Sequence, residues 1–226
     1  MGIKSGKTTA YVIFLIIFSL FIIYPVSAEV IDLTTVLGNS GFEDDLFHAQ
    51  WTATKKNANY RLDAPQVNPV IIPKGATISL EVPAGNNFIG ILNPNDEDIN
   101  GRLVHDVVKG PFPKGTVFKL TIFGNKGRLS TAPVSIFPNP KDASELTVQF
   151  FGWKAGSKPT INPNTDNWSR SPSLVLRRVF SNWAQNGQWS LETFEFVANN
   201  NLEYISLAVT GKNHKLASYV AFDLGP

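Results

Sequence analysis

Two tryptophans beside a polar loop are the side chains in this sequence best suited to binding a ligand. Trp153 stands at the entrance of the polar, proline-bearing stretch Lys154 to Pro172, and Trp168 lies inside that stretch together with Asn167 and Arg170. Sugars present apolar C–H faces that stack on indole rings, and their hydroxyl groups need polar partners at the rim. Because binding residues are often carried by loops, these four residues are predicted to bind a carbohydrate. Local packing of Trp168 within the loop is the alternative.

A further candidate lies on the stretch Phe123 to Ser130, FGNKGRLS, which reads as a strand followed by a tight turn. The turn would present Lys126 and Arg128 to solvent, where Arg128 is predicted to hydrogen-bond a ligand. A turn whose charged side chains are only solvated is the alternative. The three other tryptophans, Trp51, Trp183 and Trp189, lie in or beside alternating stretches and are expected to pack in the core or at its edge.

Catalytic residues are not predicted for this chain. It carries no G-x-S-x-G elbow, no P-loop and no G-x-G-x-x-G. Glycoside hydrolysis needs two carboxylates that face each other across a cleft. Glu192 and Glu195 are three residues apart on a predicted strand, so they point to opposite faces of it. The histidines, His48, His105 and His214, share no metal-binding spacing.

The fold class follows from apolar–polar alternation interrupted by turn residues at short intervals, which is typical of many antiparallel strands. No sustained helical period is present. Turns are expected at Asn100-Gly101 and at Gly124 to Gly127. The sequence therefore predicts an all-β antiparallel sandwich. Its alternating stretches are Thr77–Val82, Val117–Phe123, Leu146–Phe150, Leu174–Phe180, Leu191–Val197, Tyr204–Val209 and Tyr219–Asp223.

The amino terminus has the pattern of a secretory signal peptide. Lys4 and Lys7 precede the apolar run Tyr11 to Tyr24, and small residues lead to Ala28. Residues 1–28 are predicted to be the signal peptide and residues 29–226 a single β-domain that is secreted, periplasmic or extracellular. Retention of the apolar run as an anchor is the alternative, although the run is shorter than the about 20 residues that span a bilayer.

Charge and cysteine content narrow the choice of partners. The chain has 20 basic and 18 acidic residues, and removal of Lys4 and Lys7 leaves the remainder without net charge. A nucleic acid or an anionic membrane would require a basic surface, so neither is predicted as a partner after signal cleavage. The chain contains no cysteine. Its stability must therefore come from core burial, with a bound ion as an additional source.

The stretch Asn39 to Trp51, NSGFEDDLFHAQW, carries a resemblance to a known family. Its N-x-G-F-E pattern followed by an acidic residue and a tryptophan resembles the opening of galactose-binding-like jelly-roll carbohydrate-binding modules. The closing stretch Ser218 to Asp223, SYVAFD, is similar to the last strand of that family. The resemblance implies a jelly-roll sandwich in which the two stretches lie side by side.

The resemblance also implies a structural calcium that ties the first strand of such modules to the last. Carried over by position, its ligands would be Glu43, Asp223 and carbonyl oxygens near Asn39 to Gly41. Hard oxygen donors of this kind are what calcium takes. The alternative is that Glu43 and Asp223 are solvated carboxylates at strand ends.

The sequence is compatible with three functions. The first is a secreted, non-catalytic protein that resembles a carbohydrate-binding module, with a glycan or polysaccharide as partner and a structural calcium. The second is a structural or adhesive surface protein that uses the sandwich for contacts with cell-surface or assembly proteins. The third is a glycan-acting hydrolase, which would need two carboxylates converging in a cleft.

Overall fold

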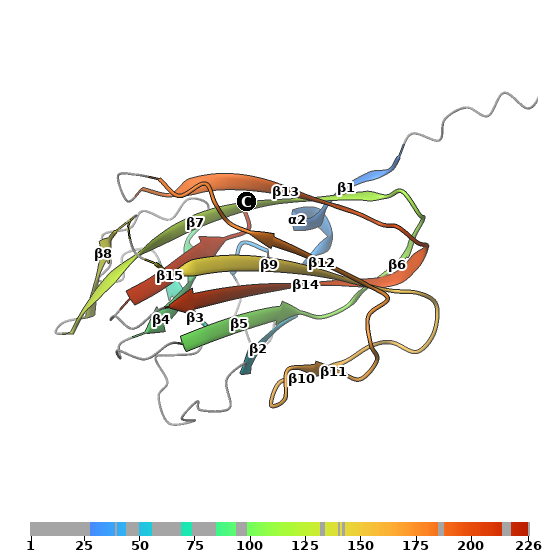
Figure 1. The fold of residues 1–226 in the computed structure, drawn as a ribbon, viewed down its shortest axis with the longest axis horizontal. Helices are drawn as coiled ribbons and strands as arrows, with labels where there is room; N and C mark the ends of the chain where they lie inside the picture. Colours follow the sequence, from blue (N-terminus) through green and yellow to red (C-terminus); the bar gives the residue numbers. More distant parts are fainter. Residues whose placement is uncertain are drawn as a thin grey trace, which may run out of the picture.

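The structure is a computed structural model of the chain, and nearly all of its regular structure is β-strand (Figure 1). It describes residues 28–38, 40–43, 50–55, 69–73, 85–93, 99–131, 134–139, 141, 143–184, 188–213 and 218–225. The predicted signal peptide up to residue 27, Thr77–Val82, His48, His214 and Asn39 lie outside the described residues. Within the described residues, no helix is long and apolar enough to span a bilayer.

The first sheet is built around the long strand β7 (Val117–Thr131). Its strands follow the order β1-β7-β15-β4-β3, and β13 and β8 also pair with β7. The contact between β1 and β7 is parallel, and the other pairings are antiparallel. The bounds of these strands are β1 (Val30–Asp32), β3 (Pro69–Pro73), β4 (Asn87–Asn93), β8 (Val134–Pro138), β13 (Ser190–Val197) and β15 (Ser218–Asp223).

The second sheet is centred on β14 (Leu202–Asn213) and β9 (Glu145–Trp153), which are paired along nine residues. Its order is β12-β9-β14-β5-β2, and β6 pairs with β14 beyond the end of β5. All of its pairings are antiparallel. The remaining strands of this sheet are β2 (Trp51–Lys55), β5 (Ile99–His105), β6 (Val108–Phe112) and β12 (Leu174–Val179).

The two sheets bury one large hydrophobic core between them. Strand β7 contributes Phe118, Leu120 and Ile122 to this core, and β9 contributes Leu146, Val148 and Phe150, all fully buried. Aromatic rings link the two layers, since the centroid of Phe118 lies 4.8 Å from that of Phe150. The predicted all-β sandwich is confirmed. Its core strands are those in which alternation is strongest, because alternate residues of each strand face the other sheet.

Two short elements complete the described structure. The helix α2 (Leu33–Val36) follows β1, and the Asp32 carboxylate accepts a hydrogen bond of 2.9 Å from the Thr34 N–H to cap it. The strands β10 (Ile161–Asn162) and β11 (Asn167–Trp168) form a small hairpin inside the polar stretch 154–172. That stretch was expected to be irregular. Its hairpin lies near β2 and β5 at one end of the second sheet (Figure 1).

Two predicted turns are wrong. Residues 124–127 lie inside β7, which runs without interruption, and Gly124 serves for packing: a β-carbon there would lie 2.8 Å from the Phe180 ring. Asn100-Gly101 lies inside β5, where a β-carbon on Gly101 would lie 2.6 Å from Ile91. Both glycines permit a close approach between layers, which a sequence cannot distinguish from a turn.

Candidate functional site

The outer face of the second sheet carries two adjoining surfaces, one aromatic and one polar. Directly opposed residues of antiparallel strands point to the same face, so the register defines rows of side chains across the sheet. One row is Asn100, Lys212 and Glu145; the next contains Arg102, Thr210 and Thr147; a third contains Val104, Ala208, Gln149 and Arg177. Farther along β9, the same face presents Phe151 and Trp153.

The aromatic surface is a compact cluster that the stretch 154–172 covers. Its buried members are Val104, Phe151, Trp153, Tyr204 and Ala208, and Val107, Ile161 and Trp168 pack against them. The Trp168 ring lies 4.7 Å from that of Trp153 and 5.7 Å from that of Phe151. The cluster is separate from the core between the sheets. The stretch 154–172 is thus packed onto the sheet by its own aromatic residue.

The predicted ligand-binding residues Trp153 and Trp168 do lie together, but Trp153 has no accessible face. Its side chain is fully buried, and its indole N–H donates a hydrogen bond of 2.9 Å to the Arg170 carbonyl oxygen. Trp168 is half-buried, and its indole nitrogen has no hydrogen-bond partner among the described residues. Stacking on a sugar is therefore open to Trp168 only, whereas Trp153 supports the covering loop from below.

Arg170 and Asn167 differ in how their side chains are placed. The Arg170 guanidinium donates hydrogen bonds to the backbone carbonyls of Lys154 (2.8 Å), Ala155 (2.9 Å) and Ser157 (2.9 Å). Most of its donors are used in shaping the loop. Asn167 is exposed on β11, opposite Asn162, so its amide faces solvent.

A buried ion pair fixes the hairpin to the sheet. The Arg102 guanidinium of β5 lies 2.5 Å from the Asp166 carboxylate, and the side chains are 7% and 10% exposed. The Thr54 hydroxyl donates to the other oxygen of Asp166 at 2.8 Å, and the Arg102 guanidinium also lies 5.5 Å from the centroid of Phe151. Burial lowers the pKa of Arg102, and the neighbouring carboxylate of Asp166 offsets part of that decrease.

Sequence reasoning missed Asp166 and Arg102. Asp166 stands two residues before Trp168 in the loop, and Arg102 follows the Asn100-Gly101 pair that was read as a turn. Asp166 has a φ of 56°, a left-handed conformation that aspartate tolerates better than most residues. A lone acidic residue in a polar loop rich in asparagine, serine and proline gives no signal of burial. Only the fold reveals its partner, 64 residues earlier in the chain.

The polar surface forms a hollow of about 230 Å³ beside the aromatic cluster. It is lined by Asn100, Glu145, Thr147, Gln149, Arg177, Thr210 and Lys212. The Thr210 hydroxyl and the side-chain carbonyl oxygen of Gln149 are buried, and neither has a hydrogen-bond partner among the described residues. The Arg177 guanidinium donates one hydrogen bond, of 3.3 Å, to the Thr147 hydroxyl. The hollow thus has two side-chain oxygens without a hydrogen-bond partner among the described residues and a guanidinium with unused donors.

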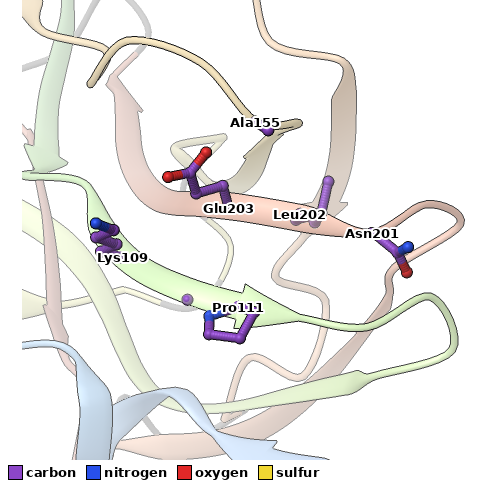
Figure 2. A pocket seen from close by; sticks show the side chains of 7 residues that line it. Lys109, Pro111, Ala155, Asn201, Leu202 and Glu203 are labelled. Atoms are coloured by element: carbon purple, nitrogen blue, oxygen red, sulfur yellow. The ribbon is translucent and has the colours of Figure 1, made fainter.

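A second hollow, of about 380 Å³, lies between β6 and the start of β14 (Figure 2). Its lining includes Pro111 and Leu202, with Lys109 and Glu203 at one end. The Glu203 carboxylate accepts a hydrogen bond of 3.0 Å from the Gly156 N–H, so it already serves to hold the covering loop. This hollow offers fewer unused polar groups than the first one and is a weaker candidate for a polar ligand.

Arg128 does not lie with the other predicted ligand-binding residues. It is exposed on β7 of the first sheet, opposite Ser218 and Phe137 on the two neighbouring strands. The second sheet, by contrast, carries Trp153 and the covering loop. The nearby Lys126 lies over the Trp183 ring at 4.7 Å and donates to the Ser144 carbonyl at 3.3 Å. The placement of Lys126 and Arg128 on a turn was wrong because β7 continues through both.

The N-terminal motif and the last strand do lie side by side, through side chains. The rings of Phe42 and Phe222 are 5.7 Å apart and nearly perpendicular, and Phe42 also lies 5.5 Å from Trp51. The hydrogen-bonded neighbours of β15, however, are β4 and β7. Phe42 is fully buried and has a φ of 55°, a backbone conformation that is unfavourable for a bulky residue. Its contacts with Phe222 and Trp51 hold the motif in place.

The two carboxylates of the predicted calcium site have different surroundings. Asp223 is fully buried at the end of β15. Glu43 is exposed and accepts hydrogen bonds from the N–H groups of Asn86 (2.7 Å) and Asn87 (3.1 Å) and from the Asn86 amide (3.2 Å). Glu43 thus closes the turn that precedes β4. Both residues offer the oxygen donors that calcium takes.

The remaining titratable candidates have structural partners. Glu192 accepts hydrogen bonds from the N–H groups of Ser181 (2.7 Å) and Asn182 (3.1 Å), and Glu195 pairs with Lys119 at 3.2 Å. His105 is buried 4.8 Å from the Trp51 ring, and burial lowers its pKa. Among the described residues, no three side chains of His, Cys, Asp and Glu are grouped so as to hold a metal ion.

The matches to known proteins are found among solved structures, at low sequence identity. No protein-family model and no curated protein matches the chain. Among solved structures, TmCBM61 in complex with β-1,4-galactotriose matches with a TM-score of 0.48 and 10% identity, over 84% of this chain and 94% of that one. The C-terminal family 22 carbohydrate-binding module of Clostridium thermocellum Xyn10B matches with a TM-score of 0.38 and 11% identity, over 81% and 87%.

An enzyme is also among the matches. A cyclase from Fischerella sp. TAU in complex with 4-(1H-indol-3-yl)butan-2-one matches with a TM-score of 0.46 and 13% identity, over 76% of this chain and 81% of that one. Carbohydrate-binding modules, the family that the sequence resembles, are thus among the matches. With these identities and TM-scores, the likeness concerns the sandwich alone. Any ligand must be argued from the side chains of this chain.

We expect the substitution Asp166→Asn to destabilise the protein by about 3 kcal/mol, because it leaves the buried Arg102 without its counter-charge. Asparagine keeps the shape of the side chain and tolerates the left-handed conformation, so the loss reports the charge. Urea denaturation monitored by tryptophan fluorescence measures the change. In the matched control Glu195→Gln, which breaks an exposed ion pair, we expect a loss below about 1 kcal/mol. Equal losses in both variants would contradict the role of the buried pair.

We expect Glu43 to make stability depend on pH in acid solution. Burial is the largest single influence and raises its pKa, but the hydrogen bonds from Asn86 and Asn87 together outweigh it and lower the pKa below the ordinary value of 4.5. A carboxyl group with a lowered folded-state pKa contributes stability above its unfolded pKa and loses that contribution as pH falls through the folded value. The difference in unfolding free energy between wild type and Glu43→Gln should therefore shrink below about pH 4.5. A difference that stays constant from pH 7 to pH 3 would contradict this role.

Proposed function

We propose that this chain is an exported, non-catalytic glycan-binding protein that holds its ligand at the polar hollow on the outer face of the second sheet. One observation carries the proposal. Thr210 is buried and Gln149 is half-buried beside the hollow, and their side-chain oxygens are buried without a hydrogen-bond partner among the described residues. A buried polar group without a partner costs about 1–3 kcal/mol. A ligand hydroxyl group would recover that free energy once the two side chains turn their oxygens toward the hollow.

The residues around the hollow match the chemistry of a sugar. Sugar hydroxyl groups both donate and accept hydrogen bonds, and the lining offers both kinds of partner. Asn100, Arg177 and Lys212 supply N–H donors, and Gln149 and Glu145 supply acceptor oxygens. The volume of about 230 Å³ is below the roughly 300 Å³ at which sites for drug-sized ligands begin. The hollow therefore suits one sugar residue of a longer chain.

The stretch 154–172 gives the site a fixed border. Rows of the same sheet face continue from Gln149 to Phe151 and then to the cluster that Trp168 covers. A polysaccharide that follows β9 would pass from the hollow to the hairpin, where Asn167 is exposed and Trp168 half-buried. We infer that these two residues, of those predicted from the sequence, form a secondary contact. Export follows from the pattern of residues 1–28, which points to a secreted, periplasmic or extracellular protein.

A second candidate function, contact with another protein, is favoured by a different observation. The strands β12 and β13 carry exposed apolar side chains: Val175, Val179, Leu191 and Val197 are 44–51% exposed. Apolar groups on strands at the side of a sandwich can pair with another chain. Val175 and Val179 lie on the same face of β12 as Arg177 and so adjoin the polar hollow, whereas Leu191 and Val197 belong to β13 of the first sheet. A defined oligomer in solution together with no glycan binding would favour the second function over the first.

We also propose that a calcium ion stabilises the contact between the N-terminal motif and β15, with Asp223 and Glu43 as its carboxylate ligands. The packing of Phe42 against Phe222, each adjacent in sequence to one of the carboxylates, supports this proposal. Asp223 is fully buried at the end of β15, and its carboxylate offers the hard oxygen donors that calcium takes. Carbonyl oxygens near Asn39 to Gly41 would complete the site.

We expect a calcium chelator to lower the melting temperature of the wild-type protein, because ion binding to the folded state adds to its stability. The variant Glu43→Ala should show a much smaller decrease on chelation, although its starting temperature will be lower owing to the lost turn hydrogen bonds. Differential scanning fluorimetry measures both. Equal decreases in the two proteins, or none in either, would remove Glu43 from the site.

We expect Thr210→Val to weaken glycan binding roughly 3- to 10-fold, the effect of one hydrogen bond, while leaving thermal stability unchanged or raised. The reason is that valine has the same shape and removes a buried hydroxyl that lacks a partner in the folded protein. A glycan array identifies a ligand, and isothermal titration calorimetry then compares the two proteins. Gln149→Leu should behave in the same way.

The matched control for this experiment is Thr193→Val on the outer face of the first sheet. Its hydroxyl lies 3.1 Å from that of Thr121, so this variant should lose a little stability and bind the glycan as wild type does. Absence of binding to any glycan on the array would overturn the proposed function. Unchanged binding by Thr210→Val, with a clear loss of stability, would show that the hydroxyl is structural.

A further inference from the structure

The polar hollow contains an excess of positive charge that its sugar-binding role does not by itself require. Two cations, Arg177 and Lys212, and one carboxylate, Glu145, line it. Arg177 lies on β12 next to Gln149, and Lys212 lies on β14 between Asn100 and Glu145. The two cations are thus on different strands and border the same concave site.

Arg177 stands apart from the other arginines of this sheet and its covering loop. Arg102 is paired with Asp166, and Arg170 donates to three backbone carbonyls. Arg178 donates to the carbonyls of Arg177 (3.0 Å) and Glu195 (3.1 Å). Arg177 has only the 3.3 Å hydrogen bond to Thr147 and no ion pair with a described residue. Its guanidinium therefore retains most of its donors on the side of the hollow.

Lys212 and Glu145 lie opposite each other on neighbouring strands, yet they form no ion pair among the described residues. Glu145 is exposed at the beginning of β9, whereas Lys212 is half-buried. The single carboxylate therefore does not neutralise either cation at close range, and the lining keeps a net charge of one positive unit.

We propose that the hollow binds an anionic sugar residue of a polysaccharide, with Arg177 and Lys212 holding its acidic group. A guanidinium takes a carboxylate or a sulfate through two parallel hydrogen bonds, and an ammonium adds a point charge. The hydroxyl groups of the same sugar then meet Thr210, Gln149 and Asn100. This inference rests on the proposed function, because it names the ligand class for the same site.

Binding of matched oligosaccharides to the whole protein tests the inference. The probes are a neutral oligosaccharide, one of equal length that carries uronic acid residues, and a sulfated one. We expect at least one of the two acidic probes to bind about tenfold or more tightly than the neutral one, as one charge-assisted interaction provides. Its affinity should fall with added salt. Preference between the acidic probes distinguishes a carboxylate from a sulfate as the recognised group.

The substitution Arg177→Gln should abolish the preference for the acidic probe: it also removes a hydrogen-bond donor to the neutral probe, but it should weaken binding of the acidic probe by about tenfold more than binding of the neutral one. Arg178→Gln is the matched control on the next residue of β12, and it should keep the preference, because its guanidinium is engaged with backbone carbonyls. Equal affinity of the wild type for neutral and acidic probes would overturn the inference and leave the proposed function standing. Failure of all probes to bind would overturn both.

Discussion

The buried ion pair between Arg102 and Asp166 determines how the outer face of the second sheet is divided. It joins the centre of β5 to the turn of the β10–β11 hairpin, and Thr54 of β2 satisfies the second carboxylate oxygen. A buried pair of this kind adds little net stability compared with an apolar contact, but removal of one partner is strongly destabilising. The pair therefore serves mainly to fix the position of the hairpin. It places Trp168 over Trp153 and Phe151, and the neighbouring rows of side chains on the same sheet face stay uncovered.

The uncovered rows explain how a stable sandwich can carry a polar site on a rigid surface. The hydroxyl of Thr210 and the amide of Gln149 are held by two strands paired along nine residues, so they lose little freedom when a ligand arrives. The charged side chains at the hollow are Arg177, Lys212 and Glu145, which lie on β12, β14 and β9 of the same sheet. On the other sheet, the Phe42–Phe222 contact and Glu43 hold the N-terminal motif in place. The contacts that hold the N-terminal motif thus lie on the first sheet, and the proposed ligand site lies on the second.

The strands could be predicted from the sequence because their alternation reflects burial on one face. The stretches around Val117, Leu146, Leu174, Leu191, Tyr204 and Tyr219 all became strands. The contact between the N-terminal motif and the last strand was also expected. The turns predicted at residues 100–101 and 124–127 were wrong because of their glycines. A residue without a side chain suits a tight turn and a close packing contact equally well.

The polar hollow could not be predicted, since it exists only through the register of β5, β14, β9 and β12. Asn100, Gln149, Arg177 and Thr210 are far apart in the sequence, and each is unremarkable on its own strand. The tryptophans of the stretch 154–172 were correctly associated with each other. Sequence could not show that Trp153 lies beneath Trp168, because an exposed loop and a loop packed on a sheet face have the same polar composition.

The most direct test of a glycan site on the outer face of the second sheet is backbone amide NMR during titration with a bound oligosaccharide. The account predicts that chemical shift changes concentrate at residues 145–149, 177 and 208–212, with smaller changes at residues 167–168. Changes confined to β13 and the outer face of the first sheet, with none around Thr210, would contradict it.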